Sequence, residues 1–193
     1  MQFKKEEIRE RILRAAESEF HRKGFNQSSM RHIARDAGVS VSNVYNYFSD
    51  KEELFDEIIN SFYHYFSQLV RDLTRDASEE DLSAENVSSI IRFVGDLVKK
   101  NRIELEMLLD GSRGTQYESF KHELIHIFEE HFRDHMGAQQ REGGNLFIFH
   151  LIASHLIESL LEISRHYVDD EWVDGNIELL VRYHLFGITR VFE

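Results

Sequence analysis

The hydrophobic residues of this chain recur at the spacing of amphipathic helices along almost its whole length. In the first such segment, residues 5–23, apolar side chains recur every fourth residue, at Ile8, Ile12, Ala16 and Phe20. Similar patterns predict eight further helices, at about residues 29–37, 41–48, 51–73, 85–101, 103–111, 115–137, 145–167 and 170–192. No segment alternates between apolar and polar residues as a half-buried strand does. The pattern therefore predicts an all-α fold of about nine helices.

Short polar residues and glycines mark the ends of the first helices. Ser28, Ser40 and Asp50 stand at the predicted starts of the second, third and fourth helices, where a side-chain oxygen can cap free backbone N–H groups. Gly24 and Gly38 follow the first and second helices and can adopt the left-handed conformation that ends a helix. The later breaks are polar or contain glycine, and they lie at residues 76–85, 111–114, 137–144 and 169–171.

The composition is that of a soluble globular chain and excludes several kinds of site. The 193 residues include no cysteine, so disulfides, thiolate metal sites and thiol nucleophiles are excluded. The absence of proline permits long uninterrupted helices. The amino terminus has no apolar secretory core, and the longest apolar stretch, Leu146–Ala153, is far shorter than the roughly 20 residues of a membrane span. We therefore expect a cytoplasmic protein without a membrane span.

Charge is distributed unevenly along the chain. The net charge is −12, yet the first 35 residues hold nine Lys and Arg against five Asp and Glu. Residues 1–55 together carry +1, which leaves −13 on the remainder. This asymmetry favours a head that binds nucleic acid and an acidic body that DNA repels.

The second and third predicted helices are separated only by the Gly-Val-Ser sequence at 38–40. Two short amphipathic helices joined by such a turn are typical of a helix-turn-helix. The apolar side of the third helix holds Val41, Val44, Tyr45 and Phe48, and the opposite side holds Ser42, Asn43, Asn46 and Tyr47. The amide and hydroxyl groups of that opposite side can reach base edges in a major groove about 12 Å wide.

This interpretation gives a set of residues predicted to contact double-stranded DNA. Arg31 projects from the first turn of the second helix toward the backbone or a base edge, and Lys51 can neutralise a phosphate. Ser28 or Ser29 can offer a hydroxyl and backbone N–H groups to a phosphate. The predicted set is Ser28, Ser29, Arg31, Ser40, Ser42, Asn43, Tyr45, Asn46, Tyr47 and Lys51.

The run at 24–54, GFNQSSMRHIARDAGVSVSNVYNYFSDKEEL, resembles the DNA-binding domain of the TetR/AcrR family of repressors. The shared pattern is Gly and an aromatic after the first helix, small hydroxyls, Ile-Ala, Ala-Gly-Val-Ser, then Val-Tyr-x-Tyr-Phe-x-x-Lys-x-x-Leu. Ser28 and Ser29 stand where the family usually has threonines, and Met30 where many members have Val. The resemblance covers about a quarter of the chain and implies a recognition helix at 41–47, a homodimer and a ligand-binding carboxy-terminal domain.

By position, the resemblance points to six of the predicted residues as DNA contacts: Arg31, Ser42, Asn43, Tyr45, Tyr47 and Lys51. Because Tyr45 falls on the apolar flank of the helical projection, we expect its ring in the core, with only its hydroxyl reaching a phosphate.

The last two predicted helices are apolar on more than one side, so each must be buried on both. One side can face the chain's own core and the other a second subunit; the alternative is that both are central core helices. The predicted dimer interface comprises Phe147, Leu151, Ile152, Leu156, Leu180, Tyr183, His184 and Phe186. Two heads held roughly 34–36 Å apart would match a palindromic operator.

A ligand pocket is expected in the carboxy-terminal domain, since most such sites are apolar with a few polar groups. The candidate lining residues are Tyr63, Phe66, Phe93, Met107, Tyr117, Phe120, Phe128 and Phe149, and the alternative is that each is ordinary core. The glycine-rich loop at 109–120 is interpreted as a turn, with anion binding through Ser112 and Arg113 as the alternative.

Eleven histidines raise the alternative of a metal site or an enzyme. His122 and His126, and likewise His131 and His135, are four residues apart and could supply two ligands from one helix face. The two pairs face apart, and no G-x-S-x-G, H-E-x-x-H or P-loop motif occurs. We predict no metal site, no cofactor and no enzymatic activity.

The sequence thus predicts a helix-turn-helix DNA-binding domain over residues 1–50 and a helical regulatory and dimerisation domain over 51–193, connected by the helix at 51–73. The predicted function is that of a sequence-specific transcriptional repressor, released from its operator by a small molecule. The alternatives are control by a protein partner, or a metal-binding or enzymatic helical bundle.

Overall fold

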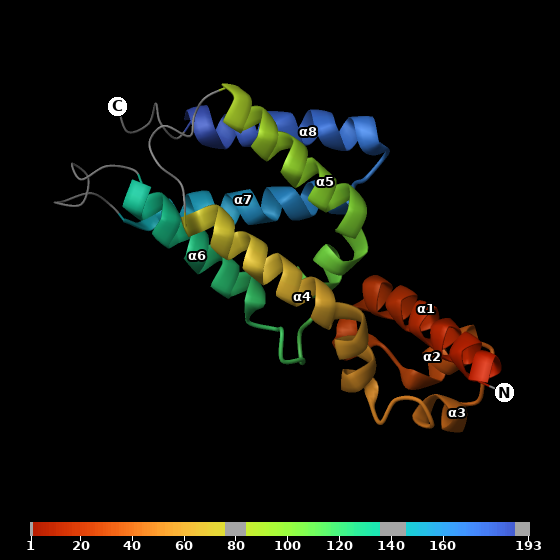
Figure 1. The fold of residues 1–193 in the computed structure, drawn as a ribbon. Coiled ribbons are helices and arrows are strands. Elements are labelled where there is room, and N and C mark those ends of the chain that lie inside the picture. Colours follow the sequence, from red (N-terminus) through yellow and green to blue (C-terminus); the bar gives the residue numbers. More distant parts are fainter. Residues whose placement is uncertain (1, 76–83, 136–145, 188–193) are drawn as a thin grey trace. The chain divides into compact units, whose positions relative to one another are not determined.

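The computed structural model describes residues 2–75, 84–135 and 146–187. Over these residues the chain forms eight α-helices and no strand (Figure 1), which confirms the predicted all-α class. The helices are α1 (Gln2–Gln27), α2 (Met30–Asp36), α3 (Val41–Tyr45), α4 (Lys51–Arg75), α5 (Ala84–Leu109), α6 (Phe120–His135), α7 (Phe147–Arg165) and α8 (Asp170–Arg182), which continues into a π-helical turn, η3 (Tyr183–Gly187).

The described residues hold one helix fewer than predicted because α5 joins two of the predicted helices. Asn101 bends α5 with non-helical backbone angles (φ −128°, ψ 28°) but does not end it. α3 is shorter than predicted, since it ends at Tyr45 and leaves Phe48 in the following turn. The predicted breaks at 76–85 and 137–144 fall mostly outside the described residues.

Side-chain caps begin α2, α3 and α4, as expected, but one of the caps is a different residue. The Ser29 hydroxyl, not that of Ser28, accepts the Arg31 N–H at the start of α2. Ser40 caps α3 by accepting the N–H of Asn43, and Asp50 caps α4 by accepting that of Glu53 at 2.8 Å. The prediction of Ser28 as a cap is wrong because its own hydroxyl donates inward.

The chain packs as two compact units, and each is discontinuous in sequence. The amino-terminal unit comprises Met1–Ser67 and Glu106–Phe120, and the carboxy-terminal unit comprises Gln68–Leu105 and Lys121–Glu193. The unit that contains the helix-turn-helix is thus larger than the predicted residues 1–50. It includes about the first two thirds of α4, up to Ser67, and the loop between α5 and α6.

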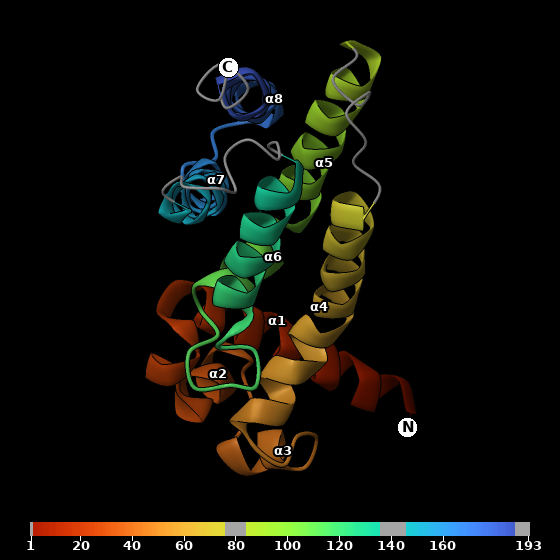
Figure 2. The same ribbon diagram turned by 90° about the vertical axis from the view of Figure 1, so that its left-hand side faces the viewer.

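The core of the amino-terminal unit is a cluster of aromatic rings at the end of α1 and the start of α4. Phe55 lies edge-to-face against Phe20 and Phe25, with ring centroids 5.1 and 5.4 Å apart. Ile12 and Ile33 are fully buried in the same unit. Figures 1 and 2 show α1, α2 and α3 gathered around the first turns of α4.

In the carboxy-terminal unit, α7 and α8 lie along each other (Figure 1). Ala153 and Leu161 on α7 and Val173 and Ile177 on α8 are fully buried. By length and composition alone, α7 could also cross a membrane. The core helix of a soluble protein passes the same test, so this is weak evidence for a span.

Candidate nucleic-acid interface

The turn between α2 and α3 is fixed by a glycine and by an arginine from α1. Gly38 has a left-handed backbone (φ 66°), which few other residues adopt without strain. The Arg11 guanidinium donates hydrogen bonds to the carbonyls of Ala37 and Gly38. A Cβ atom at Gly38 would lie 2.7 Å from the Arg11 Nη2 atom. The angle between the two helices therefore depends on a contact that the sequence pattern did not predict.

The outward side of α3 and of the turn after it presents polar and aromatic groups, which we call the recognition surface. Its members are Ser42, Asn43, Tyr45, Asn46 and Tyr47. Ser42, Tyr45 and Asn46 are exposed, while Asn43 and Tyr47 are half-buried. The expected burial of the Tyr45 ring is wrong, because 51% of this residue is exposed. About half of the surface of this residue is therefore open to a ligand.

The inward side of α3 anchors the recognition surface. Val44 is fully buried and Phe48 nearly so. The Arg9 guanidinium lies 5.5 Å from the centre of the Phe48 ring and pairs with Glu57 on α4. The short α3 helix is therefore held by packing rather than by its own length.

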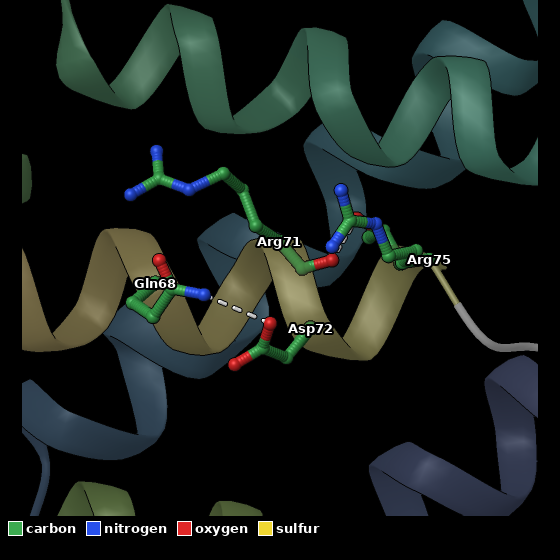
Figure 3. Close-up of a pocket in the computed structure, with 5 residues that line it drawn as sticks. Gln68, Arg71, Asp72 and Arg75 are labelled. Atoms are coloured by element: carbon green, nitrogen blue, oxygen red, sulfur yellow. Dashed lines mark hydrogen bonds between the residues drawn. The ribbon is translucent and has the colours of Figure 1, made fainter.

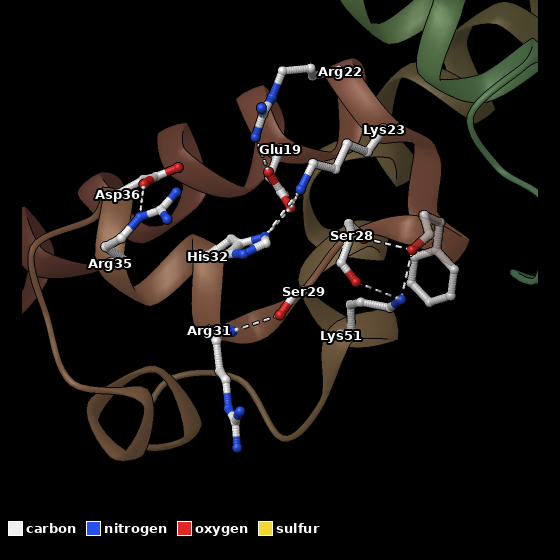
Figure 4. A network of polar contacts seen from close by, with 11 residues as sticks. Glu19, Arg22, Lys23, Ser28, Ser29, Arg31, His32, Arg35, Asp36 and Lys51 are labelled. Carbon is white, nitrogen blue, oxygen red and sulfur yellow. Dashed lines mark hydrogen bonds and ion pairs between the residues drawn. The ribbon is translucent and has the colours of Figure 1, made fainter.

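Arg31 is exposed on the first turn of α2, and no hydrogen bond or ion pair engages its side chain within the described part of the chain. Figure 4 shows the side chain extended away from the other charged groups of the unit. A guanidinium in this state has all its donors free for a phosphate or a base edge.

The remaining predicted contacts already take part in internal hydrogen bonds. Ser28 is only 7% exposed, and its hydroxyl donates to the Phe25 carbonyl at 2.6 Å. The Lys51 ammonium donates to the carbonyls of Phe25 and Ser28 and lies 4.1 Å from the centre of the Phe25 ring. Burial lowers the pKa of Lys51. Ser40 caps α3 and lies 3.0 Å from the Ser42 hydroxyl.

A buried carboxylate ties α1 to α2, and no sequence pattern indicated it. Glu19 is only 1% exposed and is contacted by Arg22 at 2.5 Å, Lys23 at 3.0 Å and His32 at 3.1 Å (Figure 4). Burial opposes ionisation, but hydrogen bonds from Lys23, His32 and Arg22 outweigh it and lower the pKa of Glu19 to about 2. Since His32 lies on α2, the cluster fixes α2 against α1.

The loop between α5 and α6 packs within the amino-terminal unit. The Gly111 carbonyl accepts the Phe25 N–H at 2.8 Å, and His21 lies 2.7 Å from Glu106. The Tyr117 hydroxyl donates to Asp56 on α4. Burial and the Asp56 carboxylate raise the pKa of Tyr117, so the phenol stays a neutral donor. The Ser112 hydroxyl is buried and donates to the Tyr117 carbonyl, which agrees with the interpretation of this loop as a turn.

The eight residues predicted to line a pocket divide between the two units. Tyr63, Phe66, Met107, Tyr117 and Phe120 fall in the amino-terminal unit, and Phe93, Phe128 and Phe149 fall in the carboxy-terminal unit. The Tyr63 ring contacts those of Tyr117 and Phe120, with centroids 4.9 and 5.0 Å apart. These rings therefore pack against one another inside the first unit.

The predicted dimer-interface residues differ in exposure. Phe147, Leu151, Tyr183 and Phe186 are exposed, Ile152 and Leu156 are half-buried, and Leu180 and His184 are buried. Burial lowers the pKa of His184, whose Nδ1 lies 3.0 Å from the Leu180 carbonyl oxygen. Two exposed leucines that were not predicted, Leu146 and Leu179, extend the apolar surface.

The histidine pairs do not form a metal centre over the described residues, where no group of three or more His, Cys, Asp or Glu side chains could hold a metal. His122 and His126 are exposed, and His126 faces Glu130 at 3.5 Å. His131 lies 3.3 Å from the Thr74 carbonyl oxygen. The side chain of His135 lies outside the described part of the chain.

Two short helices joined by a glycine turn, with a polar outer surface on the second, define a helix-turn-helix protein. Comparison with known proteins agrees: residues 12–58 match the family described as "Bacterial regulatory proteins, tetR family". That match covers about a quarter of the chain, from α1 to the first turns of α4.

Two curated proteins are similar over part of the chain. The uncharacterized HTH-type transcriptional regulator YdgC of Bacillus subtilis is 35% identical over 88 residues, 46% of this chain and 44% of that protein. The HTH-type transcriptional repressor BepR of Brucella suis is 47% identical over 53 residues, 28% of this chain and 25% of that protein. The chain spans about half the length, or less, of these curated relatives.

A solved structure shares the fold over nearly the whole chain. The crystal structure of a TetR-family transcriptional regulator from Bordetella parapertussis matches with a TM-score of 0.64. The identity is 20%, and the match covers 92% of this chain and 94% of that one. At that identity the likeness shows the fold alone.

We expect Glu19→Gln to destabilise the protein by about 2 kcal/mol at neutral pH, because the amide stays buried but no longer balances the charges of Arg22 and Lys23. The pKa of Glu19 is lowered from 4.5 to about 2, so its stabilisation is present above pH 4.5 and is lost as the pH falls toward 2. The difference between wild type and variant, measured by urea unfolding with circular dichroism, should shrink over that range.

The matched control is Glu52→Gln, which removes the same charge from an exposed site on α4. It should change the free energy of unfolding by less than about 0.5 kcal/mol. A Glu19→Gln effect that stays constant from pH 7 to pH 3 would contradict the assignment of its stabilising role to the charge.

Proposed function

We propose that the protein is a sequence-specific transcriptional repressor that acts in the cytoplasm as a homodimer and leaves its operator when a small molecule binds the carboxy-terminal unit. The observation that carries the proposal is the recognition surface on α3. Its polar groups face outward from a helix whose inner side is clamped into a core. Such a surface has the size and chemistry to enter a major groove.

The individual groups suit different parts of a duplex. Asn43 and Asn46 carry amides that can pair with adenine through two hydrogen bonds. The exposed Tyr45 ring can contact a thymine methyl group or the sugar backbone, and its hydroxyl can donate to a phosphate. Arg31 adds a free positive charge beside them. The internal hydrogen bonds of Ser28 and Lys51 favour a role for both residues in fixing the turn before α2. Lys51 uses two of its three N–H donors there, so one N–H is left for a phosphate.

Repression is supported by similarity to BepR, which is named a repressor. A protein that occupies its operator tightly in the absence of effector blocks transcription there. An effector reverses this only if it binds the DNA-free conformation more strongly than the DNA-bound one.

A homodimer is supported by the apolar surface on α7 and α8. Leu179 is 70% exposed and Phe147 57% exposed. Large apolar groups gathered on two neighbouring helices mark a protein interface, and a second copy of the same surface is self-complementary across a two-fold axis. Two recognition surfaces would then read the two halves of a palindromic operator.

Control by a small molecule is supported by a cleft of about 350 Å³ in the carboxy-terminal unit, within the range of ligand sites. Three helices run from one unit into the other: α4 after Ser67, α5 at Glu106 and α6 after Phe120. The bond from Tyr117 to Asp56 joins the loop between α5 and α6 to α4 within the amino-terminal unit. A displacement of these helices when a ligand binds can therefore be passed along the continuous helices to the amino-terminal unit.

Arg31→Ala is expected to weaken DNA binding about tenfold at physiological salt, because a free guanidinium is removed beside the recognition surface. The slope of log Kd against log salt should fall by about 0.9. Fluorescence anisotropy with a labelled operator fragment measures both. Lys100→Ala, which removes one positive charge from the carboxy-terminal unit, is the control and should change neither quantity. An equal loss in both variants would argue against contact by Arg31.

Leu151→Glu is expected to weaken subunit association at least about a hundredfold, because it places an unpaired carboxylate in the proposed interface. Sedimentation velocity across a range of protein concentrations measures the dissociation. Leu73→Glu makes the same change at another exposed leucine of the carboxy-terminal unit, on α4, and should leave the association constant unchanged. A Leu151→Glu protein that remains dimeric at wild-type concentrations rules out this surface.

A further inference from the structure

The last two turns of α4, in the carboxy-terminal unit, line the cleft of about 350 Å³. The lining residues that the structure describes all carry polar side chains: Gln68, Arg71, Asp72, Thr74 and Arg75 (Figure 3). None of the aromatic residues predicted for a pocket contributes to it. A ligand in this cleft would therefore be bound by hydrogen bonds and ionic interactions rather than by apolar contacts.

Arg71 and Arg75 stand one helical turn apart and are both exposed. Within the described residues, no side-chain hydrogen bond or ion pair engages either guanidinium. Two like charges at this spacing repel each other. The carboxy-terminal end of a helix tolerates cations, but neither guanidinium donates to a backbone carbonyl within the described residues.

The absence of partners is unusual for this unit, which holds 21 Asp and Glu against 12 Lys and Arg. The other described cations of the unit, Arg92 excepted, contact a carboxylate or, for Arg102, the Tyr167 ring. Among the residues that the structure describes, the two arginines of the cleft thus form no ion pair, although acidic residues are plentiful in the unit. Guanidinium groups in this state are suited to bind carboxylate or phosphate oxygens.

The other polar groups of the cleft are partly occupied. The Gln68 side-chain amide donates to Asp72 at 2.9 Å, and the Thr74 hydroxyl donates to the Val70 carbonyl at 2.9 Å. Figure 3 shows Gln68 and Asp72 joined, with the Arg71 guanidinium extended away from them. The Asp72 carboxylate retains acceptor capacity for hydroxyl groups.

We infer that this cleft binds a small hydrophilic organic anion, with its carboxylate or phosphate held by Arg71 and Arg75 and its hydroxyl groups near Asp72 and Gln68. The inference rests on the proposed ligand-controlled function and names the chemical class of the effector. A hydrophilic anion of this kind differs from the apolar ligand that a pocket lined by aromatic residues would bind.

Isothermal titration calorimetry on the full-length protein tests the inference with four probes at constant ionic strength. Inorganic phosphate represents the anionic group alone. Glucose 6-phosphate, gluconate and glucose then compare phosphate, carboxylate and no charge on similar polyhydroxyl frames. We expect glucose 6-phosphate or gluconate to bind at least about tenfold more tightly than glucose, because charge-assisted hydrogen bonds form only with the anions. Which of the two binds more tightly identifies the anionic group.

The double variant Arg71→Gln, Arg75→Gln should lose at least about tenfold in affinity for the preferred anion. Arg92→Gln, which removes an exposed arginine from α5 in the same unit, should bind as wild type does. Equal binding by wild type and the double variant, or no heat from any of the three anions at millimolar concentration, overturns the site. Circular dichroism confirms that both variants are folded.

The effect of the preferred anion on operator binding distinguishes failure of the site from failure of the proposed function. Release of DNA by wild type but not by the double variant supports both. Anion binding through Arg71 and Arg75 with unchanged DNA affinity supports the site and overturns effector control through it. DNA release that persists in the double variant places the effector elsewhere and overturns the inference.

Discussion

The edge-to-face contacts of Phe20, Phe25 and Phe55 determine the rest of the amino-terminal unit. They join the end of α1, the turn before α2 and the start of α4 into one core. α3 has only five helical residues, too few to be stable alone. Its position follows from Val44 and Phe48, which are buried in this unit, and from Arg11, which holds the preceding turn. The position of the recognition surface is thus set by the buried side chains and the hydrogen bonds on the inner side of α3.

The sequence was most informative where one apolar period continued over several turns. Ile12, Ala16 and Phe20 predicted the buried face of α1, and all three are fully buried. The projection failed at Tyr45, which is the last residue of the five-residue α3 and is 51% exposed although its position falls on the apolar flank of the helix. Glu19 could not be predicted, since its partner His32 is 13 residues away on another helix. Contacts between elements leave no periodic trace in a sequence.

The ligand site illustrates a different limit of sequence reasoning. Aromatic residues were reasonable candidates for a pocket, yet the rings of Tyr63, Tyr117 and Phe120 contact one another within the amino-terminal unit. A large apolar side chain is buried far more often than it lines an open site. The polar cleft on α4 has the opposite character, since Arg71 and Arg75 look in the sequence like an ordinary solvated helix face. What distinguishes them is that neither guanidinium forms an ion pair within the described residues.

The amino-terminal unit is assembled from two stretches of chain that are separated by nearly forty residues, Met1–Ser67 and Glu106–Phe120. A fragment cut after the helix-turn-helix would expose Phe20 and Phe25 by removing Phe55. A longer fragment ending at Ser67 would still leave Asp56 without Tyr117 and Phe25 without the Gly111 carbonyl. The unit that carries the recognition surface is therefore not a detachable module, and fusions or truncations that keep only residues 1–67 or fewer should yield aggregating, protease-sensitive products.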